Sequence, residues 1–268
     1  MSNERDTSEG IAKRYLSQEH IEQLEEGYRA VPRKCQKLSV GFLTRAYNNA
    51  RAREYAMHGF SRRLSTLARC IDNAFGILPP NFVGLPTRDQ LSDTAINVQA
   101  FVFNAFGSLD NLAWIWVSEK GLTKKDGSPI PNTWVGLGKG NTLVRDSFSA
   151  EFQVSLRELD GWFDHLEDFR HALAHRIPLY IPPYVVSEAN QAAYREHQDR
   201  INAAIAHSDF VAYDRLSAEQ DALGIFRPWV THAVGDQQAT PVMLHSQLLA
   251  DFATVEAVAQ KVLAELDR

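Results

Sequence analysis

The chain has 268 residues, of which 44% are hydrophobic and 23% charged, and its formal net charge is −5. This composition is typical of a globular protein with a sizeable core, and it excludes collagen-like and wholly disordered chains. The acidic balance argues against attraction of nucleic acid or anionic lipid by the whole surface. Any phosphate binding is therefore expected to be local.

The N-terminal segment and the cysteines indicate a compartment. The first ten residues are polar and acidic, whereas a signal peptide needs a basic start and then an apolar run. No stretch approaches the roughly eighteen consecutive apolar residues of a membrane-spanning helix. Two cysteines are too few for a disulfide framework. We therefore expect a cytoplasmic protein with no membrane partner.

Helical periodicity dominates the first half of the chain. Pro32 is expected to mark a turn between two helical elements. Residues 33–77 then predict one very long helix, or two helices joined near Gly59. Thr87 and Gln90 form a capping-box signature that opens a further helix. The apolar surface of that helix is wide, so we expect it at the centre of a bundle.

A long loop and a strongly amphipathic helix come next. Residues 121–140 are rich in Gly, Pro, Lys and Asn and predict a surface loop, with a short strand around Trp134. Ser149 is expected to cap a helix whose apolar residues follow the helical period. That helix should end at Ile177, because Pro178 cannot continue it.

The remaining elements complete the predicted fold. Residues 187–224 predict a peripheral excursion of two helices, and residues 226–244 predict a short β-hairpin that turns at Gly235 and Asp236. A final helix is expected over residues 246–266. The sequence thus predicts a single all-α domain, an up-and-down bundle of long antiparallel helices with a small β-hairpin appendage.

The amphipathic helix before Pro178 ends in a cluster of charged and imidazole groups. Its last residues read RHALAH, from Arg170 to His175. An Arg supplies a permanently charged fork for a phosphate, and a His can take or give a proton near neutral pH. Charge stabilisation and proton transfer are the two parts that metal-free phosphodiester cleavage needs.

This motif resembles the mark of the HEPN superfamily, in which an Arg is followed by four to six residues and then a His, with a polar residue directly after the Arg. In this chain His171 occupies the polar place, where Asn is commoner. Other pairs satisfy the spacing, among them Arg51 with His58 and Arg53 with His58. None of them has Asn, Asp or His after the Arg.

The resemblance implies a helical homodimer in which two motifs face each other, often as a metal-independent endoribonuclease. It implies that His175 is the acid or base on the ribose hydroxyl and leaving oxygen, that Arg170 holds the phosphate, and that His171 orients or supplements them. Many members act in toxin–antitoxin pairs or in defence against phage, and others bind nucleotides or have lost activity. RNA or a nucleotide and an antitoxin are the implied partners, and no metal or cofactor is expected.

Three further residues are expected to support the motif. Asp110 and Asn111 are polar residues in an otherwise apolar stretch, and we expect them to reach Arg170 and hold it. Glu167 precedes His171 by one helical turn.

Two other interpretations of the motif remain open. Arg170 can pair with Glu167 or Asp164 on its own helix, which fits a non-catalytic interaction or scaffold protein. Glu167, His171 and His175 can instead form a metal-binding stripe at successive i, i+4 positions. Such a site needs a matching Glu-x-x-His on another helix, and the sequence contains none.

A second basic surface lies earlier in the chain. It consists of arginines with aromatic residues between them: Arg51, Arg53, Arg62, Arg63, Arg69, Tyr47, Tyr55 and Phe60. Positive charge interleaved with aromatic rings can follow an RNA backbone. The favoured interpretation at the level of sequence is a solvated helix face, because runs of charge usually are.

Overall fold

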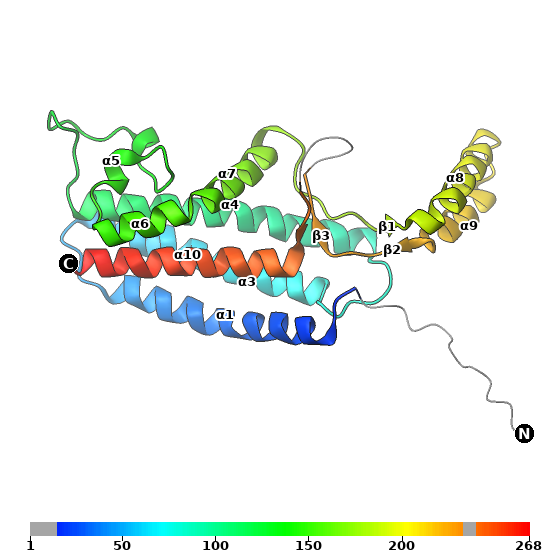
Figure 1. The fold of residues 1–268 in the computed structure, drawn as a ribbon, viewed down its shortest axis with the longest axis horizontal. Coiled ribbons are helices and arrows are strands. Elements are labelled where there is room, and N and C mark those ends of the chain that lie inside the picture. Colours follow the sequence, from blue (N-terminus) through cyan, green and yellow to red (C-terminus); the bar gives the residue numbers. More distant parts are fainter. Residues whose placement is uncertain (1–14, 233–239) are drawn as a thin grey trace, which may run out of the picture.

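Long helices of alternating direction form the body of the computed structural model, which describes residues 15–232 and 240–268 (Figure 1). In chain order these helices are α1 (Gln18–Thr44), the continuous stretch of α2 (Ala50–Glu54), η1 (Tyr55–Phe60) and α3 (Ser61–Ile77), then α4 (Arg88–Glu119), α6 (Ala150–Glu158) with α7 (Asp160–His175), and α10 (Leu244–Leu266). The predicted all-α, up-and-down bundle is confirmed.

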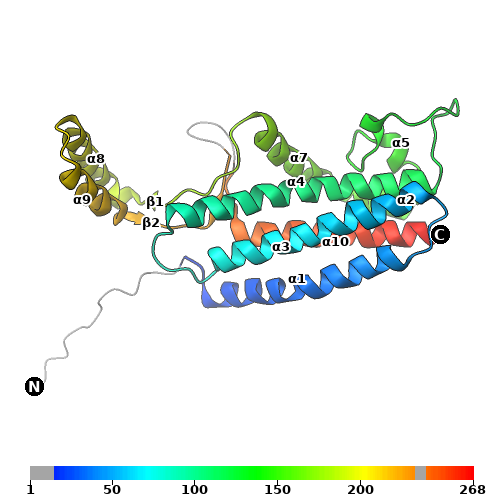
Figure 2. The ribbon, with the colours of Figure 1, turned by 180° about the vertical axis from the view of Figure 1, so that it is seen from behind.

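The central helix of the bundle is α4. It packs against α3 and α10 on one side and α7 on the other, and it buries Phe101 and Leu112 completely (Figure 2). Its surface is not covered all round, however, because Ile96 is 62% exposed and Phe103 is 43% exposed. Ile96, Phe103 and Asp110 follow one another at intervals of seven residues, which is about two helical turns. The three residues therefore share one open face of α4.

The turn predicted at Pro32 is wrong, because α1 continues through this residue as far as Thr44. A proline inside a helix loses one backbone hydrogen bond. Burial of Val31 and Leu38 on the core side of α1 offsets that loss. The chain instead reverses at residues 45–49, where the carboxylate of Glu119 accepts backbone N–H bonds from the next residues of the turn, Asn48 and Asn49.

Neither alternative predicted for residues 33–77 is correct, because the helix is interrupted at residues 45–49 and continues past Gly59 through a π-helical segment. In η1 the N–H of Ser61 donates to the carbonyl of Ala56, five residues back, and the Ser61 hydroxyl donates to the same oxygen over 2.8 Å. Single π-helical turns inside α-helices are frequent at functional sites. The π-helical segment therefore makes this helix a candidate location for a functional site.

The helix that carries the motif is divided in two at Leu159 and ends at His175, two residues before the predicted end. The guanidinium of Arg145, at the end of α5 (Thr142–Arg145), donates to the carbonyl of Leu156 and to the carboxylate of Asp160. It also donates to the carbonyl of Leu137. This buried arginine therefore fixes the preceding loop to the α6–α7 junction.

The loop itself differs from its prediction. Trp134 lies in a short 3-10 turn, η2 (Asn132–Trp134), and is 51% exposed, where a strand was expected. Pro131 precedes that turn and has no N–H to donate to a sheet. An isolated antiparallel bridge joins Thr123 to Pro129 instead.

Two small sheets carry the remaining elements. The first pairs β1 (Val185–Val186) with β2 (Gly224–Ile225), and between these strands lie η3 (Glu188–Asn190), α8 (Gln191–Ala206) and α9 (Phe210–Asp221). In Figure 1, α8 and α9 project from one end of the bundle. The second sheet pairs β3 (Trp229–Val230) with β4 (Val242–Met243). The turn predicted at Gly235 and Asp236 lies outside the described residues.

Candidate functional site

Two hollows flank the open face of α4. The first, which we call the α7 groove, has a volume of about 410 Å³ and lies between α4, α7 and the loop before α5. Its lining residues are Phe106, Leu109, Asp110, Trp114, Asn132, Thr133, Val135, Gly136, Leu137, Gly138, Asn141, Phe163, Glu167 and Arg170. The groove thus contains the arginine of the motif and two of its expected supporting carboxylates.

Arg170 is half-buried in this groove. Its Cζ lies 4.5 Å from the centroid of the Phe106 ring, at the distance of a cation–π contact. Among the residues that the structure describes, no carboxylate lies within ion-pair distance of Arg170. Asp164 pairs with Lys139 over 2.7 Å, and Glu167 lies 3.6 Å from His171. The guanidinium therefore does not form the pair on its own helix that the non-catalytic interpretation expected.

The two imidazoles of the motif lie on the exposed side of α7. His171 and His175 are both exposed, with ring centroids 6.0 Å apart. Neither residue lines the groove that contains Arg170. The structure thus brings the two histidines together at the end of α7 and places the arginine on an adjoining side of the same helix.

The expected supporting residues on α4 divide between the two hollows. Asp110 lies in the groove with Arg170, and burial raises the pKa of its carboxyl above 3.8, while the positive charges of Arg170 and Arg63 act in the opposite direction. Asn111 does not reach Arg170. Its side-chain oxygen accepts a hydrogen bond from Nε of Arg63 over 3.1 Å, in the second hollow.

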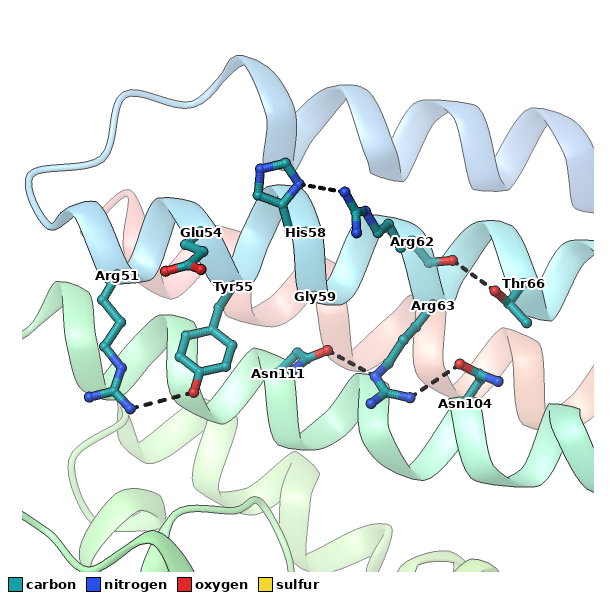
Figure 3. A pocket seen from close by; sticks show the side chains of 10 residues that line it. All are labelled: Arg51, Glu54, Tyr55, His58, Gly59, Arg62, Arg63, Thr66, Asn104 and Asn111. Atoms are coloured by element: carbon teal, nitrogen blue, oxygen red, sulfur yellow. Dashed lines mark hydrogen bonds between the residues drawn. The ribbon is translucent and has the colours of Figure 1, made fainter.

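The second hollow, which we call the arginine cleft, lies between the α2–η1–α3 helix and α4 (Figure 3). It has a volume of about 590 Å³ and is lined by Arg51, Glu54, Tyr55, His58, Gly59, Arg62, Arg63, Thr66, Asn104 and Asn111. Trp114, which lines the groove, also contacts the cleft, because Cζ of Arg51 lies 4.6 Å from the centroid of its ring.

Arg63 is the central side chain of the arginine cleft. Its Nε donates to Asn111, and its Nη1 donates to the side-chain oxygen of Asn104 over 3.1 Å. The guanidinium can lie against α4 because Gly107 has no side chain. A Cβ at that position would come within 2.5 Å of Cζ of Arg63. Gly59 likewise leaves room for Asn111, which a Cβ would approach to 2.9 Å.

The other cations of the cleft are held by aromatic and imidazole groups. Arg51 lies against Tyr55 and Trp114, whose rings are stacked 5.5 Å apart at 10°. Nη2 of Arg62 lies 3.1 Å from Nδ1 of His58. In the described part of the chain, Arg51, Arg62 and Arg63 have no carboxylate within 4.0 Å.

The sequence did not single out this cleft as a site. The arginines were interpreted as one face of a solvated helix, and Asn111 was assigned to Arg170. Gly107 was the available signal, because a glycine inside a helix costs stability and often marks a close approach. What approaches is a guanidinium from another helix.

The described residues contain neither a metal-ligand cluster nor a membrane-spanning helix. Within residues 15–232 and 240–268 no three His, Cys, Asp or Glu side chains are grouped as a metal would require, so Glu167, His171 and His175 do not form the metal stripe. None of the helices in those residues has the length and hydropathy to cross a bilayer. Comparisons with models of known protein families, with curated proteins and with solved structures give no match.

Proposed function

We propose that the chain is a HEPN-like protein that cleaves RNA without a metal, using Arg170, His171 and His175. One observation carries the proposal: a half-buried guanidinium with no carboxylate partner among the described residues is followed, on the same helix, by two exposed imidazoles. A guanidinium holds phosphate oxygens in a fixed fork. Imidazole is the side chain that most often transfers protons in catalysis.

The proposed reaction needs only these groups. His175 takes the proton of a ribose 2′-hydroxyl, and the resulting oxygen attacks the neighbouring phosphorus. The bond from phosphorus to the 5′-oxygen breaks, and protonated His171 gives a proton to that leaving oxygen. The products are a 2′,3′-cyclic phosphate and a 5′-hydroxyl. Arg170 stabilises the charge that develops on the phosphoryl oxygens.

The homodimer belongs to the same proposal, together with a cytoplasmic toxin–antitoxin or defence role. Ile96 and Phe103 expose apolar surface on the face of α4 that also carries Asp110, so a second copy packed there would bring two motifs close to one interface. Phe103→Asp is expected to convert a dimer into a monomer, measured by light scattering after gel filtration. An unchanged mass would exclude this face.

The test is RNA cleavage by the purified protein in EDTA. Arg170→Ala and His175→Ala are each expected to lower the cleavage rate by at least about 100-fold, since each removes charge stabilisation or proton transfer. The matched control is His207→Ala, an exposed histidine at the end of α8. It should leave the rate unchanged, and circular dichroism should show all three variants folded.

The result also separates the second candidate function, a non-catalytic interaction protein. The Arg170 stack on Phe106 favours that candidate, because it gives the guanidinium a structural partner. Absence of cleavage by the wild type on varied RNAs would select the interaction protein. Cleavage that Arg170→Ala and His175→Ala both retain would contradict the proposed site.

A further inference from the structure

We propose that the arginine cleft is a second site, which binds the phosphate backbone of single-stranded RNA and presents the strand to the α7 groove. The inference deepens the proposed function and rests on it for the direction of the strand. The cleft has a binding role, and cleavage stays with the residues of α7.

The first argument is the uncompensated charge of Arg63. A partly buried cation is costly unless an anion or hydrogen bonds replace its lost hydration. Arg63 is half-buried and has two neutral amide oxygens as acceptors, from Asn104 and Asn111. Its Nη2 makes no hydrogen bond to a described residue and is not among the buried unpaired atoms, so it is accessible to a ligand. An anion bound in the cleft would accept those N–H bonds.

The second argument is that the position of Arg63 is built by its surroundings. Gly107 permits the guanidinium to lie on the α4 backbone, and Gly59 permits Asn111 to reach it. The amide of Asn104 is in turn fixed to α4, since its side-chain nitrogen donates to the carbonyl of Ala100 over 2.8 Å. A side chain held in one geometry before a ligand arrives loses little entropy on binding.

The third argument is length, which favours a polyanion over a single phosphate. Arg51 and Arg63 are twelve residues apart, and twelve residues of helix rise about 18 Å. Figure 3 shows the guanidinium groups of Arg51 and Arg63 well separated along the cleft, with the Arg62 guanidinium turned toward His58. One phosphate cannot bridge that distance, whereas successive phosphates of a single strand can, as in other grooves that track a nucleic-acid backbone.

The fourth argument is the route from the cleft to the motif. Arg51 lies over Trp114, which is also a wall of the α7 groove. Asp110, which lines the groove, is close enough to both hollows that the positive charges of Arg63 and Arg170 both act to lower the pKa of its carboxyl. A strand held by Arg63 and Arg51 that passes Trp114 therefore enters the groove that contains Arg170, whose guanidinium lies over Phe106, two helical turns away along α4.

The experiment measures binding of a fluorescent 2′-O-methyl RNA 12-mer by anisotropy over a series of salt concentrations. This probe has no 2′-hydroxyl, so it cannot be cleaved by the proposed reaction. Arg63→Gln is expected to weaken binding about tenfold and to reduce the slope of log K against log salt by about one. Gly107→Ala keeps every charge but displaces the guanidinium, and it should weaken binding to a similar extent while circular dichroism shows a folded protein.

The matched control is Arg69→Gln, which makes the same change of charge on the same helix. Arg69 pairs with Asp72 outside the cleft, so its removal should change the affinity by less than about twofold. Equal binding by wild type and Arg63→Gln would overturn the proposal, as would no binding by wild type. An Arg69→Gln loss as large as the Arg63→Gln loss would overturn it too, because net charge alone would then explain binding.

Two further arms separate the ligands and the two proposals. Inorganic phosphate or a mononucleotide that competes at the same phosphate concentration as the RNA would contradict an extended site. If Arg63→Gln loses binding while His175→Ala still cleaves, the cleft stands and the proposed active site on α7 fails. If His175→Ala is inactive and Arg63→Gln binds normally, the cleft fails alone.

Discussion

The arginine cleft and the α7 groove flank the same helix and differ in how their charge is balanced. In the groove, Arg170 shares the lining with two carboxylates, Asp110 and Glu167. In the cleft, three guanidinium groups share the lining with one carboxylate, that of Glu54. A protein whose net charge is −5 therefore gathers positive charge on one side of α4.

This difference separates two properties, the chemistry of the reacting groups and the attraction for a polyanion, which a motif search does not distinguish. The motif identifies side chains whose chemistry suits proton transfer and charge stabilisation, and these lie on α7. Attraction for a polyanion depends on local charge that is not already neutralised, and that lies across α4. A short sequence motif can report the first property, whereas the second emerges only when separate helices pack together.

The largest expected effect tests the premise that an uncompensated buried charge costs stability. Asp251 is 3% exposed and accepts bonds only from Trp162 and Gln247 among the described residues, and burial raises the pKa of its carboxyl to about 6. The folded state therefore binds a proton more tightly than the unfolded chain, whose carboxyl has its ordinary pKa of 3.8. The free energy of unfolding is therefore unaffected below pH 3.8 and falls as the pH rises from 3.8 to 6. Above pH 6 ionisation of Asp251 lowers it by at most about 3 kcal/mol.

Asp251→Asn is thus expected to raise the free energy of unfolding by about 2 kcal/mol at pH 8, after the cost of a buried amide. Urea unfolding at pH 8 and at pH 3.5 measures both limits. A gain that is the same at both pH values would contradict the premise.

Asn111→Asp would give Arg63 a carboxylate partner, which it lacks among the described residues. The new side chain would accept the Arg63 bond as an ion pair and neutralise the guanidinium. We expect RNA affinity to fall by at least about tenfold while the midpoint of thermal unfolding does not fall. Anisotropy and calorimetry measure the two quantities, and unchanged affinity would show that the charge of Arg63 is irrelevant to binding.

Asp110→Asn would alter the carboxylate of the α7 groove whose pKa both Arg170 and Arg63 influence. Its removal should strengthen RNA binding about threefold, because a negative charge near Arg63 and Arg170 is lost. Cleavage should fall about tenfold, since Arg170 is no longer positioned by that charge. Single-turnover rates and anisotropy separate the two effects. Undiminished cleavage would discard Asp110 as a positioning residue.

Lys139→Ala should have the smallest effect. The ion pair from Lys139 to Asp164 is exposed at both ends, and pairs of this kind contribute little. We expect no measurable change in thermal unfolding or cleavage, because Arg145 already fixes the loop beneath it. A clear loss of cleavage would mean that this ion pair, in addition to Arg145, is needed to hold the loop in the groove.

Local signals predicted most of the fold. The capping box of Thr87 and Gln90 is present at the start of α4, and Ser149 caps α6 as expected. Pro32 misled the prediction because burial on the core side of α1 outweighs one lost hydrogen bond. The true reversal was indicated only by Asn49, whose side chain caps α2.

The candidate site was less predictable. The motif placed Arg170 and its neighbours at the end of one helix, because residues close in sequence stay close on a helix. The partner of Asn111 could not be predicted, since Arg63 is 48 residues away and reaches it only through the packing of α3 on α4. Gly107 inside α4 signals that some group approaches the helix closely, but not which group.

The most direct test of the central claim compares Arg63→Gln and His175→Ala in EDTA, with binding of 2′-O-methyl RNA and cleavage of ordinary RNA measured side by side. We predict that Arg63→Gln binds about tenfold more weakly and that its cleavage recovers at saturating RNA. His175→Ala should bind normally and not cleave. If both variants lose binding and cleavage together, or if both variants keep them, the assignment of binding to the cleft and cleavage to α7 is contradicted.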